Sequence, residues 1–222
     1  MEWRSYYMDI VFVPLGLVII LTYHVLLWHR IRTQPLATVF GIDADGRRLW
    51  VPAMMMDIDK KGIVAVQAIR NMILSSSLMV TSSIILSAGL GAVISGAYNV
   101  KKPINDLLFG AGGEFMVALK YATLLAIFIF SFLCHSQSIR FLNQVNILIC
   151  IPQEMMNLVT PDYLTELLEK ATILNIVGNR LFYAGLSLLL WIFGPMLALM
   201  CLVAMVPVLY SLDYVAGNGK TN

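Results

Sequence analysis

Charged residues are scarce in this chain of 222 residues: only 13% are Asp, Glu, Lys or Arg, whereas 59% are hydrophobic. Soluble domains average about 25% charged and about 45–50% apolar residues. A soluble domain of this length cannot bury such an excess, because small domains expose much of their surface. The net charge is only +2, so nucleic acid is not expected as a partner. The composition predicts a lipid bilayer as the solvent.

Cysteine frameworks and catalytic motifs are also missing. Cys134, Cys150 and Cys201 lie in apolar or nearly apolar stretches without a CxxC pair, which disfavours a disulfide framework or zinc fold and predicts buried free thiols. GxSxG, HExxH, P-loop and GxGxxG motifs are absent, and the acidic pair Asp43 and Asp45 lacks the Glu that completes a calcium loop. We therefore expect no catalytic residues, no metal, no cofactor and no enzyme activity.

What the chain does contain is long apolar segments. A transmembrane helix needs about 20 mostly apolar residues, and four segments qualify, at about residues 10–28, 72–97, 115–135 and 181–212. The first lacks the basic flank and the cleavage site of a signal peptide. The sequence predicts an all-α, four-span transmembrane helical bundle that forms one integral membrane domain over residues 1–222.

Basic residues predict the orientation, because cytoplasmic loops carry an excess of Lys and Arg. Ten basic residues lie in the segments 29–71 and 136–180, against five on the opposite side, Arg4, Lys101, Lys102, Lys120 and Lys220. The loop after the first span is therefore expected in the cytoplasm and both termini on the other side. The host membrane would be the plasma membrane or an endomembrane.

Helical signals continue beyond the spans. Thr160, Pro161 and Asp162 form a helix start, since Thr caps, Pro fits the first position and an acid suits the first turn. This helix should run into the fourth span, while residues 58–70 and 136–149 should extend the second and third spans into the cytoplasm. Residues 39–52, with two glycines and Pro52, predict a turn or short hairpin.

Small residues recur in the second span at every fourth position: Ser83, Ser87, Gly91 and Ser95. Such a ridge lets a neighbouring helix approach closely in lipid. A helix that lines a pore is the other interpretation, because further hydroxyls lie nearby. Both interpretations remain open from the sequence.

An ionisable residue, Lys120, lies one turn inside the third span. A charge in lipid is costly and usually faces protein. Three carboxylates share its predicted depth, and we expect an ion pair with Asp9 or Asp213 rather than with Glu114, which lies on the same helix. The alternative is that Lys120 extends to the lipid head groups.

Two histidines, His24 and His135, lie near the inner ends of the first and third spans, and Cys134 precedes one of them. A metal site or a proton relay would need them to meet. Nothing in the spacing requires that contact, so structural histidines are the other interpretation.

Four arginines lie at the predicted cytoplasmic ends of the spans: Arg30, Arg70, Arg140 and Arg180. They could form an anion pathway or contact anionic lipid head groups. The positive-inside rule alone would also explain them.

Several stretches resemble the plant membrane proteins grouped as "domain of unknown function 599": residues 100–106, 116–121, 130–136, 138–145, 177–183 and 190–195. The resemblance covers nearly the whole chain and implies a multi-span plant membrane protein. It implies no activity and no site residues.

The function that we expect from these features is a channel or transporter-like protein for small ions, with anions as one possibility. A non-catalytic membrane scaffold, with a basic cytoplasmic face that recruits lipids or proteins, is the alternative. A polar file through the bundle favours the first, and a dry leucine-filled core favours the second. Expected partners are the bilayer, anionic lipid and further copies of the chain.

Overall fold

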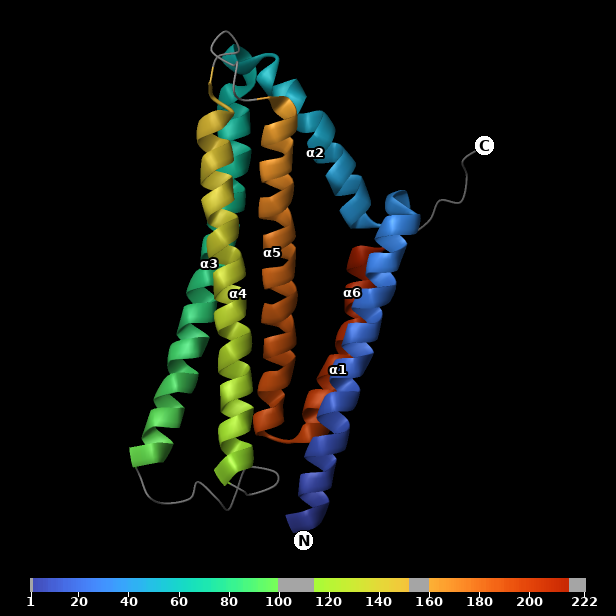
Figure 1. Cartoon of the computed structure of the whole chain (residues 1–222), viewed down its shortest axis with the longest axis vertical. Helices are drawn as coiled ribbons and strands as arrows, with labels where there is room; N and C mark the ends of the chain where they lie inside the picture. Colours follow the sequence, from blue (N-terminus) through green and yellow to red (C-terminus); the bar gives the residue numbers. More distant parts are fainter. Residues whose placement is uncertain (1, 100–113, 152–159, 216–222) are drawn as a thin grey trace. The chain divides into compact units, whose positions relative to one another are not determined.

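The computed structural model describes residues 2–99, 114–151 and 160–215, with side chains left out for residues 2–6, 58, 97–99 and 114–115. The described chain is helical, as the sequence predicts, and its one bridge pairs Thr38 with Tyr214. Its helices are α1 (Glu2–Thr33), α2 (Val39–Met55), α3 (Ile58–Asn99), α4 (Glu114–Leu148), α5 (Pro161–Leu189) and α6 (Pro195–Asp213) (Figure 1). Short 3₁₀ turns occupy Pro35–Ala37 (η1) and Leu190–Ile192 (η3).

Among the described residues, five helical stretches are long and apolar enough to span a membrane: Tyr7–Thr33, Asp59–Gly96, Met116–Leu148, Pro161–Ile192 and Pro195–Asp213. The prediction of four spans is wrong, because residues 181–212 do not form one helix. Pro195 disfavours helical geometry at Gly194, whose backbone is extended (φ 164°, ψ 149°), and starts α6 at the first helical position. The Gly-Pro step therefore ends one span and begins another.

The corrected span count changes the expected topology. Five crossings place the two ends of the chain on opposite sides of a membrane, so the prediction that both termini face outside no longer holds. If the loop after α1 faces the cytoplasm, as the basic residues predict, then the end of α6 at Asp213 faces it too. Arg180, which lies inside the candidate span Pro161–Ile192, no longer counts toward the predicted cytoplasmic basic residues.

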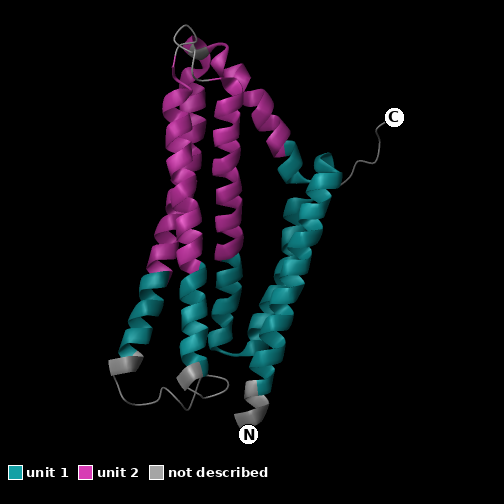
Figure 2. Ribbon diagram, in the orientation of Figure 1, with its two compact units in different colours: residues 1–42, 87–127, 183–222 teal, residues 43–86, 128–182 magenta. Residues whose placement is uncertain are grey.

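The chain divides into two compact units, and α3, α4 and α5 run through both (Figure 2). Unit 1 comprises residues 1–42, 87–127 and 183–222, and unit 2 comprises residues 43–86 and 128–182. In unit 1, α1 packs parallel to α6: Tyr23 Oη donates a 2.5 Å hydrogen bond to Asp213, and Val215 N–H donates to the carbonyl of Ala37. Gly16 permits the contact, since a Cβ there would lie 2.7 Å from Leu202.

Unit 2 contains the predicted cytoplasmic extensions. Thr160 caps α5 by accepting a 3.2 Å hydrogen bond from the Tyr163 N–H. Apolar side chains from α2, α3, α4 and α5 pack together in the part of unit 2 that the sequence predicts to extend into the cytoplasm. This extension core consists of Val51, Met55, Ala65, Ile69, Leu142, Val145, Ile149, Leu164, Leu167, Leu168 and Ala171.

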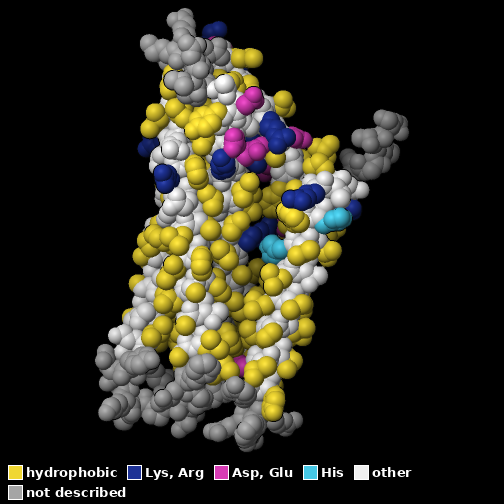
Figure 3. Space-filling model, viewed as in Figure 1, with side chains coloured by type: hydrophobic (Ala, Val, Ile, Leu, Met, Phe, Trp, Pro, Cys, Tyr) yellow, Lys and Arg dark blue, Asp and Glu magenta, His cyan; other side chains and the backbone are white. Residues whose placement is uncertain are grey.

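The turn or hairpin predicted for residues 39–52 is instead the helix α2. Its first turn is fixed in unit 1, where Gly41 N–H donates to Thr38 Oγ1 and a Cβ at Gly41 would meet the Pro35 carbonyl. Its last turns bury Val51 and Met55 in the extension core. Burial of this apolar face outweighs Gly46, which costs a helix only about 1 kcal/mol. Figure 3 shows acidic and basic side chains gathered over α2.

Candidate functional site

Buried polar side chains connect the membrane stretches of α3, α4 and α5 in unit 2. Ser83 Oγ lies 3.4 Å from Ser131 Oγ, which donates a 3.0 Å hydrogen bond to the carbonyl of Gly178. At the edge of the extension core, Ser138 Oγ donates to the Ala171 carbonyl at 2.7 Å. We call this group the polar seam; its members are Ser76, Ser83, Ser131, His135, Ser138, Asn175 and Asn179.

Two asparagines extend the polar seam along α5. Asn175 Nδ2 donates a 2.9 Å hydrogen bond to Ser76 Oγ on α3, and Asn179 Nδ2 donates to Asn175 Oδ1 at 3.1 Å. The buried Oδ1 of Asn179 accepts no hydrogen bond from the described residues. The two amides therefore form a hydrogen-bonded chain, and Asn179 Oδ1 is a buried acceptor without a donor among the described residues.

His135 fits into the polar seam because position 178 has no side chain. The histidine is fully buried, and a Cβ at Gly178 would lie 2.7 Å from its Nε2 and 2.8 Å from its Cδ2. The imidazole ring lies directly against the Gly178 backbone. Glycine at position 178 therefore allows α4 and α5 to pack closely around a polar ring.

Arg180 lies deep in the membrane stretch of α5, not at the cytoplasmic end of a span as the four-span scheme placed it. It is nine residues before Leu189, the last residue of α5, which corresponds to about 14 Å along the helix. Residues 171–192 contain no other charged residue. If a hydrocarbon core about 30 Å thick begins near Leu189, this arginine lies close to its middle.

The structure brings Lys120 and Asp9 together in unit 1. Lys120 Nζ is 3.2 Å from Asp9 Oδ1, and both side chains are almost fully buried. Trp191 Nε1 donates a 2.7 Å hydrogen bond to the same oxygen, and its ring lies 5.3 Å from the lysine nitrogen. The other proposed partner, Asp213, bonds to Tyr23 instead; the Glu114 side chain lies outside the described residues.

The small-residue ridge of α3 is packed only at its inner end. Ser83 is fully buried in the polar seam, whereas Ser95 is exposed. A Cβ added at Gly91 would meet no described atom within 4 Å, and the buried Oγ of Ser87 has no hydrogen-bond partner among the described residues. Within the described chain, no neighbouring helix fills the groove that the sequence predicts at Gly91.

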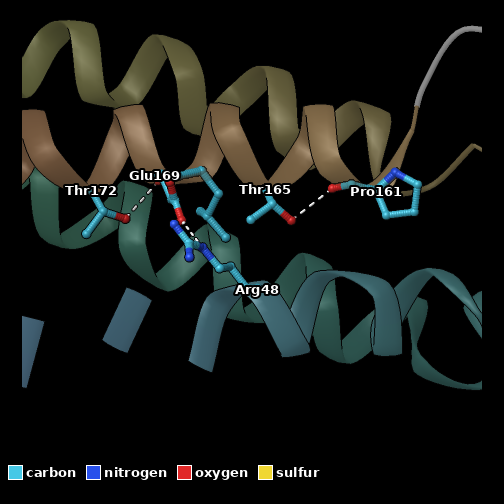
Figure 4. Close-up of polar contacts among 6 residues, drawn as sticks. Arg48, Pro161, Thr165, Glu169 and Thr172 are labelled. Carbon is cyan, nitrogen blue, oxygen red and sulfur yellow. Dashed lines mark hydrogen bonds and ion pairs between the residues drawn. The ribbon is translucent and has the colours of Figure 1, made fainter. Parts of the chain in front are cut away.

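The cytoplasmic arginines differ in their surroundings. Arg48 Nε of α2 lies 2.9 Å from Glu169 Oε1 of α5 (Figure 4). Burial lowers the pKa of the half-buried Arg47, while Asp43 and Glu169 oppose that shift. The Arg32 guanidinium stacks 3.7 Å from the centre of the Trp28 ring. Arg30, Arg70 and Arg140 are exposed.

The two histidines belong to different units, and each has its own environment. His24 Nδ1 lies 2.7 Å from the Ile20 carbonyl on its own helix, and its ring packs edge-on against Tyr23. Among the described residues, no group of three or more His, Cys, Asp or Glu side chains is arranged to hold a metal ion.

Sequence reasoning missed Asn175, Asn179 and Trp191. A signal was present for the asparagines, since two amides at positions i and i+4 in an apolar run share one helix face. The predicted fourth span begins at about residue 181, so both asparagines lie outside it and their burial in a membrane helix was not expected. Trp191 needed the three-dimensional contact with Asp9.

Residues 11–217 match the family model "Protein of unknown function, DUF599". No curated protein and no solved structure matches the chain. The five apolar helices of the described chain indicate a multi-pass membrane protein. Because the family model covers most of the sequence, the chain belongs to the family of DUF599 proteins.

Proposed function

We propose that this protein moves small ions across its membrane and that it favours anions. The observation that carries the proposal is the position of Arg180, about 14 Å inside the end of α5. A charge at that depth is costly in lipid, and such residues mark ion or substrate pathways in membrane proteins. A fixed positive charge favours an anion over a cation.

The polar seam supplies the remaining chemistry. An anion that leaves water needs N–H and O–H donors in place of its hydration shell. Asn179 precedes Arg180 on α5, and Asn175 and Ser76 hold its amide group in place. The hydroxyls of Ser83 and Ser131, on α3 and α4, already donate to protein acceptors along the same stretch, so the donor proposed for the anion is the second N–H of the Asn179 amide.

Lys120 has a different role in this proposal. Its ammonium group is buried against Asp9 and Trp191 in unit 1, which neutralises its charge. A closed ion pair of this kind contributes to the structure rather than to permeation. We therefore assign Lys120 and Asp9 to stability and Arg180 to ion selection.

The test is chloride flux into proteoliposomes under an imposed membrane potential. Loss of a charge-assisted hydrogen bond of about 1.5–3 kcal/mol corresponds to a roughly ten- to hundredfold slower step. Arg180→Gln should lower flux by that factor, Arg180→Lys should retain part of it, and Arg140→Gln, an exposed arginine on α4, should leave it unchanged. Normal flux through a well-folded Arg180→Gln protein would contradict the proposal.

The membrane scaffold remains the second candidate, and the extension core favours it. This part of unit 2 is apolar and holds α2 against the long helices, so α2 presents its charged face on a firm support. The same flux experiment separates the two functions. Proteoliposomes that behave like empty vesicles for both anions and cations would favour the scaffold.

A further inference from the structure

A hollow of about 460 Å³ lies on the surface of α3 in unit 2, near the cytoplasmic end of the second span. Six residues line it: Gln67, Arg70, Asn71, Ile73, Leu74 and Ser77. They follow helical spacing, since Arg70, Leu74 and Ser77 are related by steps of four and three. The hollow therefore runs along one face of the helix.

The end of the hollow nearer the cytoplasm is rich in hydrogen-bond donors. Arg70 has five N–H groups, and the amides of Gln67 and Asn71 have two each. In the described part of the chain these three side chains make no hydrogen bond or ion pair. Arg48, in contrast, is paired with Glu169, and Arg32 is stacked on Trp28. Arg70 thus keeps its charge available for a ligand.

The opposite end of the hollow is apolar. Ile73 and Leu74 line it, and the Ser77 hydroxyl is already bonded to the Ile73 carbonyl at 2.8 Å. From position 67 to position 77 the helix rises about 15 Å. That length spans a phospholipid head group and the beginning of its acyl chains, and the change from polar to apolar follows the same direction as in a lipid.

We propose that this hollow binds one phospholipid with an anionic head group from the cytoplasmic leaflet. The Arg70 guanidinium pairs with the phosphate, since its planar donors match phosphate oxygens. The Gln67 and Asn71 amides bind the remaining head-group oxygens, and the acyl chains pass over Ile73 and Leu74. A soluble anion would leave the apolar end of the hollow uncovered.

The experiment is native mass spectrometry of the purified full chain with added phosphatidylserine or phosphatidylcholine. Each basic residue near an anionic membrane contributes about 1 kcal/mol, or roughly a fivefold change in affinity. Arg70→Gln should weaken phosphatidylserine binding by about that factor or more. Leu74→Trp should weaken it without a change of charge, because the indole fills the hollow. Arg140→Gln, an exposed arginine outside the hollow, is the matched control.

Several outcomes would overturn this inference. Equal loss in Arg70→Gln and Arg140→Gln would show a general attraction of basic residues for anionic lipid. Equal affinity for phosphatidylcholine, or complete displacement of the lipid by inorganic phosphate, would exclude an anionic-lipid site. The readout is binding and not flux, so it stands or fails independently of the transport proposal.

Discussion

Two stretches of unit 2 are built from the same helices but have opposite interiors. In the extension core the buried side chains are Leu, Ile, Val, Met and Ala, with Thr165 buried nearby, whereas the stretch that holds the polar seam buries Ser76, Ser83, Ser131 and His135 beside Phe128 and Phe182. The arrangement is the reverse of a simple expectation that apolar cores belong inside membranes.

The difference follows from the two solvents. Water drives apolar side chains together, so the extension is stabilised by the area it buries. Lipid is itself apolar and gives no such driving force, and helices there associate through close packing and hydrogen bonds. The hydrogen bonds of the polar seam therefore help to hold three helices together. Association of the helices does not require a charge, so Arg180 needs another explanation.

The largest expected effect is all-or-none. It concerns the side of the membrane on which the extension lies. Cys150 is exposed just beyond the end of α4, whereas Tyr7 is exposed near the start of α1. In a protein with Cys134→Ala and Cys201→Ala, an impermeant maleimide should label Cys150 only after cells are permeabilised. A Tyr7→Cys variant that also lacks Cys150 should be labelled in intact cells. Labelling of Cys150 in intact cells would place the extension core outside the cell and contradict the predicted cytoplasmic position.

A second prediction compares truncations in the two interiors. Leu168→Ala in the extension core should lower the free energy of unfolding by about 2–5 kcal/mol. Ser138→Ala in the polar seam should lower it by only about 0.6 kcal/mol, the average for such bonds in membranes. Thermal melting in detergent gives both values, and Ile173→Ala, at an exposed position of α5, serves as the control. Similar losses at Leu168 and Ser138 would remove the distinction between the two stretches.

A third prediction asks whether a buried ion pair behaves like the neutral bonds of the polar seam. Lys120→Met leaves Asp9 buried without its cation and should destabilise the protein by about 1–3 kcal/mol. Replacing both residues, with Asp9→Leu and Lys120→Met, should recover part of the loss because no buried charge remains. Denaturation of four proteins provides the cycle: the wild type, Asp9→Leu, Lys120→Met and the double variant. Additive losses would show that the two residues do not interact.

A small net effect is expected at Gly178. Gly178→Ala places a methyl group against the His135 ring and should cost about 1–3 kcal/mol through overpacking, less about 1 kcal/mol of gained helix propensity. Gly89→Ala, where a Cβ meets nothing within 4 Å, should be neutral or slightly stabilising. A second change, His135→Ala, should relieve the penalty at Gly178. Equal melting temperatures for both glycine variants would mean that α4 and α5 are not closely packed there.

Much of this architecture could be predicted from the sequence. Apolar length identified membrane helices, the Thr-Pro-Asp cap placed the start of α5, and the depth of Lys120 directed attention to Asp9. The Gly194-Pro195 step could not be resolved, because proline is tolerated inside membrane helices and composition does not distinguish a kink from a break. Because residues 181–212 were predicted as one span, Arg180 was placed at its end, and Asn175 and Asn179 were placed outside it. The helix α2 was missed because its stability depends on Val51 and Met55 packing against distant helices.

The most direct test of the central claim is the reversal potential of purified protein in a planar bilayer under a potassium chloride gradient. We predict a current that reverses near the chloride equilibrium potential, because Arg180 presents a fixed positive charge in the membrane stretch. A reversal near the potassium equilibrium potential, or no protein-dependent current for either ion, would contradict the account.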